Sequence, residues 1–323
     1  MNIQTISIVV PTKGCVNKCP FCVSRMHDSP YENHWDKFEM EKRIKYAVMN
    51  GVNTCIITGT GEALQNTKFL INLGELFYKM NYPFPNVELQ TTGVFLSECE
   101  DKFNEKGELY KVYAYINLLK HIGVNTISLS ISNVFDDNLF DDNNMKVIGV
   151  SEKLKFNLSD LVKLLKEHGF NIRFSLNMLK VYDDYFAHQI IERCKTLGAD
   201  QITFRKMYYD LDKDGFCKND EGRWVKANKC ASGTIEMLKT YIEGFQSKSG
   251  GGDIAETPTI YPGKGEFLYT LPFGGKVYSI EGMSVVIDSD CMSKENNESL
   301  KYVILRENGK LYCRWDDKGS LIF

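Results

Sequence analysis

The sequence predicts an α/β fold, a partial (β/α)6 TIM-like barrel followed by a small C-terminal antiparallel β-module. The first observation is a unit of helix, glycine and strand that occurs four times, which is typical of βα repeats and a parallel sheet. The second is a buried apolar strand near the start of the chain. The third is a change, after about residue 265, to short strands separated by turns. Right-handed βα units curl toward a barrel, and six of them leave it open.

The predicted first strand covers residues 6–11. It is a continuous apolar run and ends at Pro11, which has no N–H group to donate to a sheet. The run is too short for a signal peptide, and no stretch approaches the ~18 apolar residues that span a bilayer. The chain has 10 cysteines and no secretory signal, which favours metal chemistry over disulfides. We therefore expect a cytoplasmic protein without a membrane segment.

The repeated unit places a glycine directly after each of four predicted helices, where a C′ glycine ends a helix. In the third helix, Ser159 is the expected N-cap. A strand is predicted after each of these four glycines. With a further strand at residues 87–91 and the opening strand, the predicted barrel has six strands. The helices are predicted at residues 39–50, 109–122, 159–168 and 184–197, and the glycines are Gly51, Gly123, Gly169 and Gly198.

The pattern changes after the sixth strand, which is predicted at residues 202–205. An irregular stretch runs to residue 231, a helix is predicted at 234–245, and a glycine-rich run at 247–253 is typical of a flexible linker. Later, Asn308-Gly309 indicates a hairpin. The expected parts are a barrel core over residues 1–215, an irregular and helical connector with the linker over 216–253, and a β-module over 254–323 that covers the barrel mouth.

Three cysteines follow the first strand with the spacing CxxxCxxC: Cys15, Cys19 and Cys22. This spacing lets one short loop wrap three thiolates around a single inorganic centre. A [4Fe-4S] cluster has four irons and is usually held by cysteine thiolates, so three ligands leave one iron open. The alternatives are a zinc site completed by a distant Cys or His, or three unconnected thiols. Zinc sites normally use two separated CxxC pairs, and the sequence has no second CxxC.

The triplet, with Phe21 directly before the third cysteine, resembles the radical S-adenosylmethionine (radical SAM) superfamily. In that superfamily SAM chelates the open iron, and one electron cleaves SAM to methionine and a 5′-deoxyadenosyl radical that abstracts hydrogen from a substrate. The resemblance implies that Cys15, Cys19 and Cys22 bind the [4Fe-4S] cluster and that Phe21 lies near the adenine. It also implies an electron donor such as flavodoxin or ferredoxin.

A glycine-rich run, Gly59-Thr60-Gly61-Glu62, follows the second predicted strand. In parallel α/β sheets ligands bind beyond the carboxyl ends of the strands, and glycines let the backbone approach a ligand closely. One βα unit after the cysteines, this run resembles the GGE-type motif of the superfamily. The resemblance implies that its backbone and Glu62 receive the SAM amino group. Ala63 stands where the superfamily often has proline.

Further polar residues end the third to sixth strands. Alternation along a strand places such residues on one face of the sheet, where they can bond ribose hydroxyls or a carboxylate. A guanidinium at the end of the sixth strand can bind a carboxylate through two nitrogens. The ordinary alternative is a polar barrel interior with ordered water. By position, the resemblance implies SAM contacts from Thr92, Ser130, Asn177 and Arg205.

The sequence leaves the substrate open. A net charge of −3 gives no sign of the basic face that binds a nucleic-acid backbone. The chain also lacks the extra cysteine motifs that accompany many peptide-modifying members of the superfamily. Both points favour a small-molecule substrate, of nucleotide-like character. The alternatives are a radical SAM enzyme that modifies peptides or proteins, and a non-catalytic iron-sulfur protein that transfers electrons or binds a partner.

Two other sets of residues are open to a metal-binding interpretation. Four thiols after the barrel are enough for a second cluster, although their spacing contains no CxxC or CxxxxC pair. An acidic loop at residues 136–144 is expected to be solvated and not to bind a divalent cation. The four cysteines are Cys217, Cys230, Cys291 and Cys313.

Overall fold

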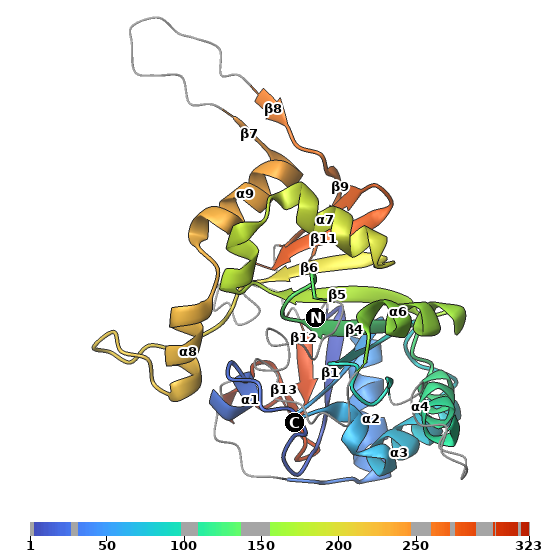
Figure 1. Cartoon of the computed structure of the whole chain (residues 1–323). Coiled ribbons are helices and arrows are strands. Elements are labelled where there is room, and N and C mark those ends of the chain that lie inside the picture. Colours follow the sequence, from blue (N-terminus) through green and yellow to red (C-terminus); the bar gives the residue numbers. More distant parts are fainter. Residues whose placement is uncertain are drawn as a thin grey trace, which may run out of the picture.

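A curved sheet of 11 strands forms the centre of the molecule, in the order β13-β12-β1-β2-β3-β4-β5-β6-β11-β10-β9 (Figure 1). The computed structural model describes residues 3–26, 32–97, 109–136, 156–246, 260–271, 275–288, 300, 302–315 and 318–322. The strands are β1 Thr5–Val10, β2 Thr54–Gly59, β3 Asn86–Thr91, β4 Thr126–Ile131, β5 Asn171–Asn177, β6 Gln201–Arg205, β9 Glu266–Thr270, β10 Lys276–Ile280, β11 Met283–Asp288, β12 Tyr302–Leu305 and β13 Leu311–Tyr312. Strands β7 Gly244–Gln246 and β8 Ile260–Pro262 pair separately.

Helices connect the barrel strands, and α2, α3, α4 and α6 lie together along one side of the sheet (Figure 1). Their apolar residues face the core; in α6, for example, Leu158, Leu161 and Leu165 are buried. No helix in the described ranges is long and apolar enough to cross a membrane. The helices are α1 Val23–Met26, α2 Lys37–Met49, α3 Thr67–Lys79, α4 Leu109–Ile122, α6 Leu158–Glu167, α7 Ala187–Thr196, α8 Asp220–Asn228 and α9 Ser232–Glu243, with short 3-10 helices η1 Ala63–Gln65, η3 Lys180–Asp184 and η4 Lys318–Ser320.

The repeated unit of helix, glycine and strand is confirmed. The glycines after α2, α4, α6 and α7 all have positive φ, between 73° and 98°, as a C′ glycine requires. The start of α6 differs from the prediction, because its N-cap is Asn157 and not Ser159. The Asn157 side chain accepts a hydrogen bond from the backbone N of Asp160. Helix α6 begins at Leu158, and that register buries its leucines.

Strands β1 to β6 pair in parallel in chain order. Their carboxyl ends therefore meet at one rim of the sheet, and the loops that follow them come together there. Residues in register on neighbouring strands face the same side, so Ser130, Ser175 and Thr203 form one polar row. The opposite face of β4 is apolar and buried, with Ile127, Leu129 and Ile131 at most 1% exposed. This arrangement confirms the α/β fold with an open parallel barrel.

The C-terminal strands join both edges of the barrel sheet. The expected antiparallel pairs are present, between β9, β10 and β11 and between β12 and β13. However, β11 continues the barrel sheet beyond β6, and β12 continues it beyond β1, both in parallel. An edge strand of an open barrel carries unpaired N–H and C=O groups, and these additions satisfy them. Local hairpin signals in a sequence do not reveal such distant pairing.

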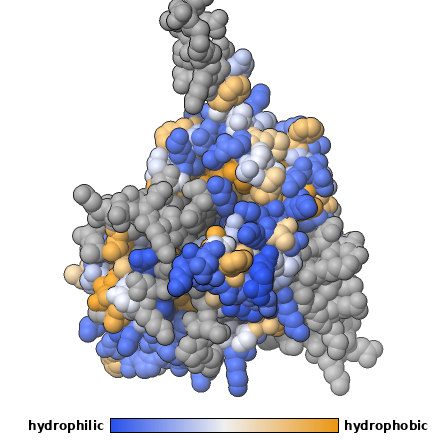
Figure 2. Space-filling view, turned by 90° about the vertical axis from the view of Figure 1, so that its left-hand side faces the viewer, coloured by the Kyte–Doolittle hydropathy of each residue, from blue (hydrophilic) through white to orange (hydrophobic). Residues whose placement is uncertain are grey.

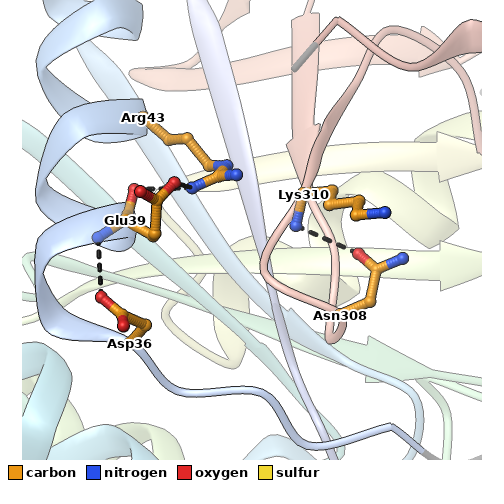
Figure 3. Close-up of polar contacts among 5 residues, drawn as sticks. All are labelled: Asp36, Glu39, Arg43, Asn308 and Lys310. Carbon is orange, nitrogen blue, oxygen red and sulfur yellow. Dashed lines mark hydrogen bonds and ion pairs between the residues drawn. The ribbon is translucent and has the colours of Figure 1, made fainter.

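The turn between β12 and β13 lies beside the start of α2 (Figure 3). The His34 N–H donates a hydrogen bond to the Glu307 carbonyl at 3.0 Å. Close by, Asp36 caps α2 by accepting a hydrogen bond from the backbone N of Glu39 at 2.9 Å. Asn308 orders the turn through its side-chain oxygen. The C-terminal hairpin is therefore attached to the segment that leads into the first long helix.

The connector after β6 also differs from the prediction, because the stretch expected to be irregular contains α8. Asn219 caps this helix by accepting a hydrogen bond from the backbone N of Gly222 at 2.7 Å. The sequence did not indicate the helix because it is polar and has a glycine in its first turn. The next helix, α9, covers nearly the predicted range. The expected linker at residues 247–253 lies outside the described residues.

Candidate functional site

The loop with the three cysteines leaves β1 and packs against the loop that follows β2. The backbone N–H of Thr12 donates a hydrogen bond to Oγ1 of Thr60 at 3.0 Å. The backbone N–H of Val16 donates to Oε1 of Gln65, also at 3.0 Å. Both bonds join residues that are nearly 50 positions apart. The two motifs recognised in the sequence are therefore in contact at the rim of the sheet.

Gly61 makes this close contact possible. A Cβ atom at this position would lie 2.5 Å from Oγ1 of Thr12, 2.6 Å from the carbonyl oxygen of Gly14 and 2.9 Å from Cβ of Cys15. Two of these three atoms belong to backbone or to the base of a side chain, so they cannot move aside cheaply. Gly59 is similarly confined, because its Cβ would lie 2.7 Å from the carbonyl oxygen of Gly61. The cysteine loop can therefore reach its position only because residue 61 is glycine, and Gly59 allows the tight turn of the glycine-rich loop itself.

The thiols of Cys15 and Cys19 both have a raised pKa. Burial, and after it the neighbouring thiols of Cys22 and Cys15, raise the pKa of the Cys19 thiol to about 12. The pKa of Cys15 is also raised, first by burial and then by the charges of Glu62 and Cys22, against a backbone hydrogen bond from Asn17. Thiols held together at raised pKa are protonated at neutral pH, and they lose their protons when they bind a metal centre.

Cysteine thiols are the usual protein donors of an iron-sulfur cluster. Across the described ranges, no group of three or more His, Cys, Asp or Glu side chains is placed to hold one metal ion. In a [4Fe-4S] cluster each thiolate binds a different iron, so the three sulfurs need not converge on one point. Cys15, Cys19 and Cys22 lie on one loop at the rim, and Cys19 and Cys22 are half-buried. These residues fit the cluster that the sequence motif predicts.

Glu62 lies at the junction of the loops after β2 and β3. Its side chain is only 4% exposed, and burial raises its pKa against the hydrogen bonds it accepts. The carboxylate accepts hydrogen bonds from Oγ1 of Thr91 at 2.7 Å, from the backbone N of Thr92 at 3.0 Å and from Oγ1 of Thr92 at 2.9 Å. These bonds fix the orientation of the carboxylate. Glu62 thus holds the second and third strand ends together.

The predicted residues on β4, β5 and β6 lie side by side. Nδ2 of Asn177 donates a hydrogen bond to Oγ of Ser130 at 3.1 Å. Arg205 is the register partner of Asn177 on the next strand. Ser130, Asn177 and Arg205 therefore form a continuous polar segment of the rim. Thr92, which was also predicted, follows β3 and is therefore on the other side of β4 from these residues. Its Oγ1 accepts a hydrogen bond from Nδ2 of Asn17 in the cysteine loop at 2.9 Å.

Four buried polar atoms at this rim have no hydrogen-bond partner among the described residues: Asn17 Oδ1, Ser132 Oγ, Ser175 Oγ and Arg205 Nε. Buried polar groups in proteins are almost always paired, so unpaired ones indicate a site for water or a ligand. Arg205 lies on β6, Ser175 lies on β5 and Ser132 directly follows β4. These three are on the part of the rim away from the cysteine loop. The rim therefore offers a thiol-bearing side and a polar side with free hydrogen-bonding groups.

Arg173 has a different role from the other polar residues on its strand. Its guanidinium forms an ion pair with Glu88 on β3 and donates a hydrogen bond from Nε to Oε1 of Gln201 on β6 at 2.7 Å. Glu88 is 2% exposed. The three side chains connect β3, β5 and β6 below the rim. This network accounts for the buried charge inside the barrel, and it leaves Arg173 engaged with protein groups.

The candidate second cluster is not assembled in the described residues. Cys217, Cys230 and Cys313 do not form a metal-binding group there, and Cys291 lies outside them. Cys230 is buried, and burial raises its pKa to about 11. All eight described cysteines are free thiols. The acidic loop after residue 136 also lies outside the described residues.

Sequence reasoning missed several residues of the site. Thr12, Asn17 and Gln65 bond the predicted motifs to one another. None belongs to a pattern with a recognised spacing, and only the approach of distant loops reveals them. Helix α8 was also missed, although it packs beside the cysteine loop. Its side of the molecule faces the viewer in Figure 2, where hydrophilic residues cover most of the described surface and hydrophobic ones form small areas.

Comparisons with known proteins agree with the motif. The sequence matches the family model of the Radical SAM superfamily over residues 9–190. A search of curated proteins gave no match. The match to the family model starts within β1 and ends within α7, so it includes the cysteine loop, the glycine-rich loop and β2 to β5.

Several solved structures resemble the chain. Streptococcus suis SuiB bound to precursor peptide SuiA has 19% identity and a TM-score of 0.41, over 64% of this chain and 40% of that one. Native anSMEcpe with bound AdoMet and Kp18Cys peptide has 15% identity and a TM-score of 0.46, over 65% and 54%. HydG from Carboxydothermus hydrogenoformans has 13% identity and a TM-score of 0.43, over 75% and 53%. The chain thus spans about half or less of these proteins.

Proposed function

The chain belongs to the radical SAM superfamily, and from this premise we propose that it cleaves S-adenosylmethionine reductively and abstracts a hydrogen atom from a substrate at the barrel mouth. The observation that carries the proposal is the contact between the cysteine loop and the glycine-rich loop at the rim. That contact brings three thiols, a fixed carboxylate and two close-packed glycines together at the ends of β1, β2 and β3. Ligands of parallel sheets bind at such rims.

Cys15, Cys19 and Cys22 are the proposed ligands of a [4Fe-4S] cluster. When bound, the cluster supplies the electron that cleaves SAM to methionine and a 5′-deoxyadenosyl radical. The protein's own residues bind and orient the reactants and exclude water. The hydrogen bonds to Thr60 and Gln65 hold the loop of ligands in place. The spacing of the ligands and the donor chemistry support this assignment.

The remaining rim residues are the proposed SAM envelope. Gly59, Thr60 and Gly61 offer backbone groups to the amino end of SAM, and Glu62 adds a negative charge there. Thr92 supports Glu62 through two hydrogen bonds. On the other side of the rim, the amide, hydroxyl and guanidinium groups suit the ribose and the carboxylate, and the unpaired Arg205 Nε supports this. Those proposed contacts are Ser130, Asn177 and Arg205, with Phe21 near the adenine.

We propose a small polar substrate, of nucleotide-like character, rather than a large RNA. The buried unpaired hydroxyls of Ser132 and Ser175 suit a ligand that forms hydrogen bonds, and a site of this kind rejects analogues that lack those groups. An electron donor such as flavodoxin or ferredoxin would supply the reducing equivalents. A reducing cytoplasm is the proposed location, and the free thiols of the described cysteines support it.

The test is anaerobic reconstitution with iron and sulfide, followed by reduction and an assay for 5′-deoxyadenosine. We expect a brown protein with four irons per chain, in line with the cluster type, that forms 5′-deoxyadenosine only when SAM and reductant are present. Cys22→Ala should abolish both the colour and the product. Cys313→Ala, a half-buried thiol outside the rim, is the matched control and should retain both. A brown protein that binds SAM without cleaving it would instead be an electron-transfer or binding protein, and a colourless zinc protein would refute both.

A further inference from the structure

Helix α8, which follows the barrel in sequence, packs against the cysteine loop. The rings of Phe21 and Trp224 lie 5.8 Å apart between centroids, at an interplanar angle of 41°. This geometry is within the range of favourable aromatic pairs. Both side chains are half-buried. Phe21 immediately precedes Cys22, so Trp224 is in contact with the residue next to a proposed cluster ligand.

Two polar contacts join the same helix to the end of the cysteine loop. Arg25 Nε lies 3.1 Å from Glu221 Oε1, and Glu221 is 18% exposed. Nδ2 of Asn219, the N-cap of α8, donates a hydrogen bond to the carbonyl oxygen of Met26 at 3.3 Å. Arg25 and Met26 belong to α1, and Figure 1 shows α8 directly beside this helix. Three contacts of different kinds therefore connect one short helix to one short loop.

The other end of α8 is attached to the polar side of the rim. The backbone N–H of Cys230, just after the helix, donates to the carbonyl oxygen of Met178 at 3.0 Å. Lys229 pairs with Leu179 in an isolated β-bridge. Met178 and Leu179 directly follow the rim residue Asn177. Helix α8 thus extends from the end of β5 to the cysteine loop after β1, across the mouth of the open barrel.

A second anchor makes this attachment rigid. The carboxylate of Asp183 accepts hydrogen bonds from the backbone N of Ala231 at 2.9 Å and from Oγ1 of Thr234 at 2.5 Å. Asp183 lies in η3, and Thr234 lies in the first turn of α9. The junction between α8 and α9 is therefore fixed to the barrel, and from this fixed end α8 reaches its contacts with the cysteine loop. Free movement of α8 away from the loop would break all three contacts at once.

We propose that α8 is a strap that holds the cysteine loop against the rim, and that Trp224 is the positioning residue of the strap. Trp224 restrains the ring of Phe21 and keeps water from the side of the loop that carries Cys19 and Cys22. This inference rests on the proposed function, because it assigns to Trp224 a role in the lifetime of the bound cluster and in the affinity for SAM. The proposed action of Trp224 is through Phe21, with which its ring is paired.

The experiment compares Trp224→Ala and Trp224→Phe with the wild-type protein after anaerobic reconstitution. Arg223→Gln is the matched control, because Arg223 lies on the solvent side of the same helix, in an exposed pair with Asp220. Two quantities are measured: the rate at which the visible absorbance of the cluster is lost in air, and the KM for SAM separately from kcat. Iron content and thermal unfolding are recorded for every variant.

We expect Trp224→Ala to lose its cluster absorbance about 3- to 10-fold faster and to raise the KM for SAM by a similar factor, as the energy of an aromatic pair implies. The kcat at saturating SAM should change less than twofold. Trp224→Phe should restore most of the wild-type behaviour, and Arg223→Gln should match the wild type.

The inference is refuted if Trp224→Ala keeps the wild-type rate of cluster loss and KM, or if Trp224→Phe behaves like Trp224→Ala. A variant that unfolds without reconstitution is replaced in the comparison by Glu221→Gln, which removes the ion pair to Arg25 alone and should show the same changes to a smaller degree. A wild-type protein that assembles no cluster overturns the proposed function instead. The two failures are therefore distinguishable.

Discussion

Asn17 and Thr92 join the cysteine loop, which follows β1, to the end of β3, although β2 lies between these two strands in the sheet. Nδ2 of Asn17 donates a hydrogen bond to Oγ1 of Thr92 at 2.9 Å, and the same hydroxyl donates to Glu62 at 2.9 Å. A single threonine therefore connects the loop of proposed cluster ligands to the carboxylate proposed for the SAM amino group. The side-chain oxygen of the same amide, Oδ1 of Asn17, is buried and has no hydrogen-bond partner among the described residues.

This relationship makes Thr92→Val a sensitive test. The substitution keeps the shape of the side chain and removes both hydrogen bonds of the hydroxyl. We expect a loss of about 1–3 kcal/mol in the free energy of unfolding and a several-fold higher KM for SAM, because Asn17 and Glu62 each lose a buried partner. Thr196→Val, whose hydroxyl bonds only its own helix at an exposed position, is the control. Equal KM values for the two variants would contradict the role of Thr92.

Gly61→Ala tests the contact between the two loops. The added Cβ would lie within 2.9 Å of three atoms of the cysteine loop, so the loop must move outward. We expect a folded protein that retains less than half of the wild-type iron after reconstitution, an effect of about 1–3 kcal/mol from overpacking. Gly233→Ala is the control, because no atom lies within 4 Å of the Cβ built there. Full iron content in Gly61→Ala would show that the loop does not need this contact.

Arg173→Met tests the ion pair below the rim. The substitution leaves Glu88 buried without its partner, which should cost about 3–5 kcal/mol of stability. The double variant Glu88→Gln/Arg173→Met should recover much of this loss, because no charge is then left buried. Urea unfolding of the wild type, both single variants and the double variant gives the coupling energy. Additive effects of the two changes would mean that the pair is not coupled.

The lowered pKa of Glu41 leads us to expect that the stability of the protein depends on pH. Hydrogen bonds from Lys45 on α2 and Lys79 on α3 lower the pKa of Glu41 from 4.5 to about 2. A carboxylate with a lowered pKa in the folded state stabilises the protein above its unfolded pKa, and the contribution disappears as the pH falls through the folded value. Glu41→Gln should therefore lower Tm at pH 7, and the difference from wild type should shrink between pH 4.5 and 2.

The C-terminal strands should be needed for the barrel itself. Removal of residues 300–323 would expose the edge of β1, which pairs with β12 through residues 5–8. Since β1 leads directly into the cysteine loop, we expect the truncated protein to unfold at a lower temperature and to assemble little cluster. A truncated protein with the wild-type Tm and iron content would support an independent C-terminal module, as the sequence alone suggests.

The sequence was sufficient for the features that depend on local chemistry. The glycines after the helices were recognisable because only glycine adopts their left-handed conformation without strain. The cysteine loop was recognisable because three thiols within eight positions can share one cluster. The predicted helices, and the strands predicted at residues 6–11, 87–91 and 202–205, occur within a few residues of their expected bounds.

Other features depend on contacts between distant parts of the chain, and only the tertiary structure decided them. The pairing of β12 with β1 and of β11 with β6 satisfies edges that exist only once the barrel has formed. The position of α8 beside Phe21 joins residues about 200 positions apart. No local pattern encodes such contacts, because burial and hydrogen-bond partners are set by whichever segments the completed sheet brings together. Short sequence motifs thus predicted the residue types of the site, and the tertiary structure determined which loops come into contact to form it.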